Sequence, residues 1–308
     1  MKSNLITSVF FCLFISAHAQ HISKEDLNRL KIQEDSMKKP SIGLIQGINA
    51  SDRFKADSIF TKTFVRALKT RNSFYYPFDS LFTISKLYSP DSLFKIYTWQ
   101  LIIDDNIIRQ HGAIQMNTAD GILKLFPLID KSENTQKIQD TIANNYGWMG
   151  AVYYKIILNK AKDKSIYTLL GFDEDNIRCN RKFIEVLHFE NEEPIFGGNY
   201  FDFRKDSSQS QQRARHIMEF KKEAGPRLTF DREMNMIIME HLVSESNEPK
   251  KKWTLVGDGD YEGFKWNGTT WVYIPKVFDN VTPEGKTPMP KPLLDEKGNI
   301  DNSNLKVQ

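Results

Sequence analysis

The amino-acid sequence predicts a mainly β protein with N-terminal helices, an α+β fold. Before residue 93, apolar residues recur at the three- and four-residue spacing of amphipathic helices. Beyond it, short runs rich in β-branched and aromatic residues alternate with turn residues, as in antiparallel hairpins. Aromatic residues make up 12% of the chain, a proportion that favours sheets over helices.

The first 19 residues have the pattern of a secretory signal peptide. A basic residue precedes an apolar run over 5–17, and the small residues Ala17 and Ala19 are those that a signal peptidase recognises. The run is shorter than the about 20 residues that a membrane-spanning helix needs, and no later stretch is long enough either. We therefore expect cleavage between Ala19 and Gln20, followed by export to the periplasm, the cell surface or the medium.

Residues 20–93 are expected to form a helical segment with three helices. The first has Ser23 as its N-cap and is interrupted at Pro40 and Gly43. The second, over 51–71, carries apolar residues at helical spacing, and the third is a short helix over 79–88.

Residues 94–275 are expected to form an antiparallel β domain of roughly a dozen strands. The predicted connections are short turns such as Asp120-Gly121 and Asn267-Gly268, whereas parallel pairing requires crossovers of a dozen residues or more. Open twisted sheets rarely exceed about ten strands. The meander should therefore fold as a two-layer sandwich, a barrel or propeller-like sheets, and the sequence leaves these three arrangements open.

Two polar stretches are expected to lie outside the main strands. Residues 132–148 have few apolar anchors and predict a short helix or a crossing loop. Residues 276–308 hold four of the twelve prolines and are expected to form a flexible tail rich in Pro and Lys.

Charge and cysteine content exclude two further features. The formal net charge is +3 with both signs interspersed, unlike the concentrated basic surface of a nucleic-acid-binding protein. Of the two cysteines, Cys12 lies in the predicted signal peptide, which leaves Cys179 without a partner in the mature chain. We expect no nucleic-acid binding and no internal disulfide.

An acidic stretch near the C-terminal end resembles the first half of a calcium-binding loop. Asp258, Asp260 and Glu262 occupy alternate positions before Gly263, as in an EF-hand. The residue at the clamping position is Thr269, which is no bidentate ligand, and the flanks look like strands. An EF-hand is therefore excluded. Calcium held by the three carboxylates in a β setting stays a hypothesis, and a glycine-relaxed turn over 257–263 is the favoured interpretation.

Three histidines lie in predicted neighbouring strands. If His188, His216 and His241 faced one side of a sheet, they would provide ligands for zinc. No pair of them has the spacing of a known metal motif, so satisfied or surface histidines are favoured.

Cys179 and the acidic run 173–175 are the remaining candidates for catalysis. The basic neighbours Arg178 and Arg181 would favour a thiolate at Cys179, although no base or oxyanion site accompanies it and an unpaired loop cysteine is favoured. Paired carboxylates carry out glycoside hydrolysis only at a set separation across a cleft. The run lies where a turn is expected, and turn formation is the favoured role.

Trp266 and Trp271 flank the predicted turn at Asn267-Gly268. This spacing predicts that the two indoles lie as a cross-strand pair near the end of a hairpin. Exposed tryptophans of this kind would stack on sugars or on a partner protein, while core packing is the more frequent role.

Several stretches together resemble an uncharacterised family of exported proteins common in Bacteroidetes: FKIYTWQ, YTLLGFD, FIEVLHFENEEPIFGG, RLTFD, MEHLV and GDGDYEGFKW. The resemblance covers about residues 90–275 and implies an exported bacterial protein without implying an activity. Four Asp-Ser/Thr-apolar tripeptides are similar to O-glycosylation acceptors of such bacteria, and three of them serve equally as helix caps. Their acceptor residues are Ser58, Ser80, Ser92 and Thr141.

These patterns favour a non-enzymatic binding or structural protein of the cell envelope, whose partner is an envelope protein or a glycan. The alternative is an exported hydrolase whose carboxylates and histidines converge only in the fold. An enzyme predicts a deep cleft with at least two convergent polar side chains and a perturbed carboxylate or histidine. A binding module predicts a shallower surface lined by aromatic residues.

Overall fold

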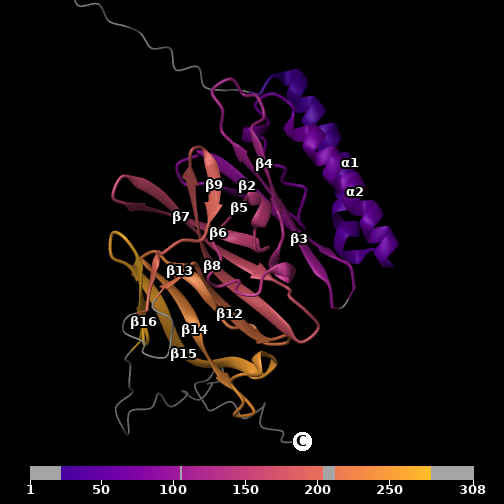
Figure 1. Ribbon diagram of the computed structural model, residues 1–308. Helices are drawn as coiled ribbons and strands as arrows, with labels where there is room; N and C mark the ends of the chain where they lie inside the picture. Colours follow the sequence, from indigo (N-terminus) through magenta and orange to yellow (C-terminus); the bar gives the residue numbers. More distant parts are fainter. Residues whose placement is uncertain (1–21, 105, 204–211, 279–308) are drawn as a thin grey trace, which may run out of the picture.

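The computed structural model describes residues 22–104, 106–203 and 212–278. In this part of the chain two helices are followed by three mostly antiparallel sheets (Figure 1). The predicted mainly β fold with N-terminal helices is therefore confirmed. The predicted signal peptide, residues 1–19, and the predicted tail beyond residue 278 lie outside the described residues.

The helices α1 (Lys24–Gln46) and α2 (Ala50–Leu68) pack side by side on the outside of the first sheet (Figure 1). The Ser23 side chain accepts a hydrogen bond from the backbone N–H of Asp26, which confirms the predicted N-cap. The expected interruption at Pro40 and Gly43 is wrong, because the helix continues through both. Burial of one face of α1 against α2 outweighs the cost of a proline inside a helix, about 3 kcal/mol for the missing hydrogen bond and the ring clash together.

The N-terminal sheet has the strand order β1-β2-β3-β4. Its strands are β1 (Ser85–Tyr88), β2 (Phe94–Ile102), β3 (Ile108–Met116) and β4 (Leu125–Ile129). The third helix predicted over 79–88 is wrong, because the second half of that stretch is strand β1. Its residues pair along β2, with Leu87 opposite Ile96, and this long-range pairing overrides the local helical pattern.

The central sheet has the order β5-β9-β8-β7-β6, with β12 also paired to β8. The third, C-terminal sheet has the order β11-β10-β16-β15-β14-β13. The strands of the central sheet are β5 (Ala143–Asn144), β6 (Val152–Ala161), β7 (Lys164–Asp173), β8 (Cys179–Glu190), β9 (Glu193–Phe196) and β12 (Arg215–Lys221). The strands of the C-terminal sheet are β10 (Phe201–Asp202), β11 (Gln212–Arg213), β13 (Leu228–Asp231), β14 (Met236–Ser244), β15 (Leu255–Trp266) and β16 (Trp271–Ile274).

The strand order departs from a simple meander. The chain leaves the central sheet after β9, adds two short strands to the C-terminal sheet and returns as β12 beside β8. One of those short strands, β10, pairs in parallel with β16, so the expectation of purely antiparallel pairing is wrong at this point. The two strands are far apart in sequence, and a short hairpin connection therefore places no constraint on their direction.

Three buried clusters join the layers. Phe64 of α2 packs edge-on against Trp99, which ties the helices to the N-terminal sheet. Ile114 of β3 and Phe183 of β8 belong to a cluster between the N-terminal and central sheets. The neighbouring residue Ile184 points to the other side of β8 and joins the cluster shared with the C-terminal sheet. The helices and the three sheets therefore form a stack, which is closer to a sandwich than to a barrel or a propeller.

Candidate functional site

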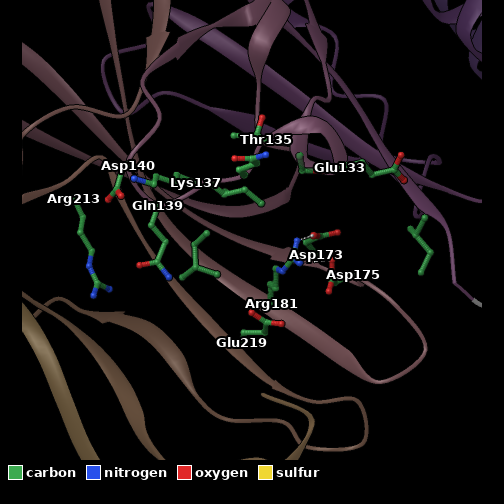
Figure 2. A pocket seen from close by; sticks show the side chains of 15 residues that line it. Glu133, Thr135, Lys137, Gln139, Asp140, Asp173, Asp175, Arg181, Arg213 and Glu219 are labelled. Carbon is green, nitrogen blue, oxygen red and sulfur yellow. Dashed lines mark ion pairs between the residues drawn. The ribbon is translucent and has the colours of Figure 1, made fainter. Parts of the chain in front are cut away.

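A cleft of about 640 Å³ opens at one end of the interface between the N-terminal and central sheets. Its volume falls within the usual range of small-molecule sites, about 300–1,000 Å³. One wall is residues 132–141, called the crossing segment, and the other is the face of the central sheet that carries Asp173, Arg181 and Glu219 (Figure 2). We call this space the acidic cleft.

A row of charged side chains crosses the central sheet at the base of the acidic cleft. Asp173 of β7 and Glu219 of β12 both lie directly opposite Arg181 of β8 in the strand register. The Arg181 guanidinium lies 2.7 Å from Asp175 Oδ1 and 3.7 Å from Asp173 Oδ2. Since each strand contributes one member, the row is held on rigid elements rather than on a loop (Figure 2).

Asp173 is a buried carboxyl group, 4% exposed. Its pKa is raised from 3.8 to about 7, chiefly by burial and also by the nearby Asp175 and Asp130 carboxylates. Arg181 lowers the pKa, as does the hydrogen bond of 2.8 Å that Gln110 Nε2 donates to Asp173 Oδ1. Because its pKa is close to 7, this group is partly protonated at neutral pH.

Burial also raises the pKa of Asp175, and the Glu219 carboxylate adds to this effect. Burial also raises the pKa of Cys179 to about 11, and the Glu219 and Asp175 carboxylates contribute to this rise. Cys179 is buried at the start of β8, so a thiolate is disfavoured, and the cysteine expected in a loop lies in a strand. It is unpaired, and the expected absence of a disulfide holds for the described residues.

The crossing segment is held over the sheet by Arg215, which is fully buried. Its Nε donates to Glu185 Oε1 at 2.6 Å, and its Nη1 donates to the carbonyl oxygens of Ile138 and Thr141. The backbone N–H of Arg215 also donates to the Gln139 carbonyl at 3.1 Å. A crossing loop, one of the two structures predicted for this stretch, is therefore present, and a buried ion pair fixes it as a wall of the cleft.

A second cavity of about 440 Å³ adjoins the acidic cleft at Glu133, which lines both. Gln110 lines this second cavity and is 2% exposed. Its Oε1 has no hydrogen-bond partner among the described residues, and neither has the indole Nε1 of Trp99 in the same lining. Unsatisfied buried polar atoms are rare in native proteins and call for an explanation.

The predicted calcium residues lie in a strand, not in a turn. Asp258, Asp260 and Glu262 belong to β15, which pairs with β14 on both sides of a bulge. The turn expected over 257–263 is therefore wrong, because the chain there is strand β15, although Gly259 has φ 86° within the bulge. Asp258 Oδ2 lies 2.8 Å from His241 Nδ1, and Glu262 accepts a hydrogen bond from the Tyr273 hydroxyl.

No group of three or more His, Cys, Asp or Glu side chains is arranged to hold a metal ion within the described ranges. The zinc hypothesis is wrong for the three histidines, because the fold does not bring them together. His188 lies near Glu190 in the central sheet, and His216 packs against Phe264, where burial lowers its pKa to about 3. His241 lies on the C-terminal sheet. Calcium binding at β15 stays a prediction.

The tryptophan pair is confirmed. Trp266 and Trp271 face each other in the register of β15 and β16, with ring centroids 5.3 Å apart. The turn between them is closed by the Asn267 side chain, which accepts hydrogen bonds from the backbone N–H groups of Thr269 and Thr270. Trp271 is fully buried, so this pair closes the core rather than forming an exposed stacking surface.

Comparison of the chain with models of protein families, with curated proteins and with solved structures found no significant match. The resemblance to exported Bacteroidetes proteins stays a prediction. No helix of the described residues is long and apolar enough to cross a membrane.

The sequence patterns name Asp173 and Asp175 as an acidic run but do not single out Gln110 or Glu219. One signal was available for Asp173. It follows Leu169 and Gly171 in strict alternation, so the strand period places its carboxyl group on the buried face. No such signal predicts that Glu219 lies opposite Arg181 in the strand register, because the chain forms two strands of another sheet before β12 pairs with β8.

Proposed function

We propose that this protein is a non-enzymatic binding protein of the periplasm or cell surface that holds a small polar ligand in the acidic cleft. The observation that carries the proposal is the charged row of Asp173, Arg181 and Glu219, fixed on three adjacent strands below the crossing segment. A site built on strands keeps polar groups in place for recognition. Asp173 already bonds to Gln110 and is almost closed off from the cleft, which suits a recognition surface better than a reacting group.

A ligand screen by thermal denaturation tests this function. A compound that binds the folded state raises the melting temperature by mass action. We expect a panel of amines, sugars, amino acids and dicarboxylates to contain such compounds. Gln139→Trp should abolish their effect, because the Gln139 side chain lines the cleft while only its backbone holds β12. Gln46→Trp, an exposed change on α1, is the matched control. A panel without any effect on the wild type would contradict the proposal.

An exported hydrolase is the second candidate, and one observation favours it. The cleft is lined by a carboxyl group of pKa about 7, as expected of a general acid, and by no aromatic side chain. Assays with chromogenic glycosides and esters between pH 5 and 9 test it. Turnover that Asp173→Asn abolishes would establish catalysis and displace the binding proposal.

Export is proposed separately, from the signal pattern over 1–19. Expression of the full chain in a bacterial host should yield a mature protein whose N-terminal residue is Gln20. Recovery of an intact N-terminus from the cytoplasm would contradict export and leave the binding proposal unaffected.

A further inference from the structure

We infer that the ligand of the acidic cleft carries a protonated amine or a guanidinium group, which binds between the Asp175 and Glu219 carboxylates. This inference rests on the proposed binding function and specifies the chemical class of the ligand. Its first support is the balance of charge. Five carboxylate side chains and three basic side chains line the cleft, an excess of two negative charges when all are ionised.

Glu219 is one of the cleft carboxylates that have no ion-pair partner among the described residues. It lies opposite Arg181 in the register, yet the short Arg181 contact goes to Asp175 at 2.7 Å. Among the described residues Glu219 forms no ion pair within 4.0 Å, while its neighbour Glu174 pairs with Lys222 at 3.0 Å. A cation entering from the cleft would therefore meet a carboxylate that has no charged partner.

Gln110 provides the second, independent support. Its Nε2 donates to Asp173, and its buried Oε1 has no partner within the described ranges. The cavity that it lines is a neighbour of the acidic cleft and shares the lining residue Glu133 with it. Like the carboxylates, this atom is an acceptor and calls for a donor. An ammonium group provides three N–H donors and a guanidinium group five, which matches that need.

The chemistry of the site argues against the opposite class of ligand. A carboxylate or phosphate placed beside Asp175 and Glu219 would meet like charges, and such juxtaposition is strongly unfavourable. A neutral sugar would provide hydroxyl donors but would not offset the charge excess, and no aromatic side chain lines the acidic cleft to stack on it.

Isothermal titration at pH 8 tests the inference with three probes of similar length: putrescine, the neutral 1,4-butanediol and the dianion succinate. We expect putrescine to bind and the other two not to bind. Glu219→Gln and Asp175→Asn should each weaken putrescine binding by about tenfold, because each removes a charge-assisted hydrogen bond. Asp163→Asn, in the exposed β6–β7 turn, is the matched control and should bind as the wild type does.

The outcomes separate the two proposals. Binding of succinate or butanediol that Gln139→Trp blocks, without binding of putrescine, would overturn the amine inference and leave the binding function standing. Putrescine affinity unchanged in both carboxylate variants would also overturn the inference. Loss of every signal from a full panel of polar compounds would overturn both. A further probe, Nα-acetyl-lysine amide, identifies the source of the amine: tighter binding than putrescine indicates a peptide side chain, weaker binding a free amine, and either supports the inference.

Discussion

Asp173 couples the protonation state of the acidic cleft to the stability of the fold. Its pKa is about 7 in the folded protein and near 3.8 in its ordinary state, so folding favours the protonated form. The contribution of protonated Asp173 to the free energy of unfolding is complete below pH 4 and is lost as the pH rises through 7. Arg181 and Gln110 reduce the cost of ionising this group, whereas Asp175 and Asp130 increase it.

Asp173→Asn should therefore change the pH dependence of the free energy of unfolding. Because asparagine is uncharged and still accepts from Gln110, the variant should gain roughly 2–4 kcal/mol over the wild type between pH 4.5 and pH 8. Urea denaturation at the two pH values measures this difference. The control Asp163→Asn should follow the wild type, and parallel pH profiles for Asp173→Asn and wild type would contradict a raised pKa.

Cys179 should be unreactive in the folded protein. It is 3% exposed and its pKa is raised to about 11, so both access and the thiolate fraction are low. Alkylation by iodoacetamide at pH 8 should be at least about a hundredfold slower in the native than in the urea-unfolded protein, because about two pKa units separate the thiols. Equal rates would show that the thiol is open to solvent.

Among the elements, the crossing segment depends on a single buried side chain. Arg215 joins Glu185 of β8 to the carbonyl oxygens of Ile138 and Thr141. Removing one partner of a buried ion pair leaves the other charge uncompensated, which costs about 3–5 kcal/mol. The wall of the acidic cleft therefore relies on an interaction that lies outside the cleft itself.

Arg215→Met should lower the free energy of unfolding by about 3–5 kcal/mol and speed hydrogen exchange of the crossing segment. Chemical denaturation and exchange measured by mass spectrometry provide the two readings. Arg227→Met, an exposed change after β12, should alter neither. Unchanged exchange over 132–141 in Arg215→Met would contradict the anchoring role.

The elements also show which local patterns are reliable. The Ser23 cap and the Asn267-Gly268 turn are predictable because their hydrogen bonds join residues two or three apart. The stretch 79–88 has helical spacing, yet its second half becomes β1, since its pairing with β2 is worth more than the local preference. Gly257 and Gly259 look like turn residues in sequence, but Gly257 pairs with Leu242 and the bulge opposite β14 accommodates Gly259 within β15.

For the whole molecule, the sequence predicts strands but not how they are shared among sheets. The three sheets exchange chain segments, with β12 returning to the central sheet and β10 pairing in parallel with β16. Such partners are chosen by the packing of apolar faces between layers, which has no short-range signature. The acidic cleft arises from this exchange, because it combines the crossing segment with ends of β7, β8 and β12 (Figures 1 and 2).

The central claim is that a cationic ligand binds in the acidic cleft, and nitrogen-15 NMR spectra of the wild type titrated with putrescine test it most directly. We expect the amide shifts to change over 132–141 and 173–181 and near Glu219, and to stay constant in α1 and in the C-terminal sheet. Shifts confined to those distant elements, or spectra that putrescine leaves unchanged throughout, would contradict a putrescine site in the cleft.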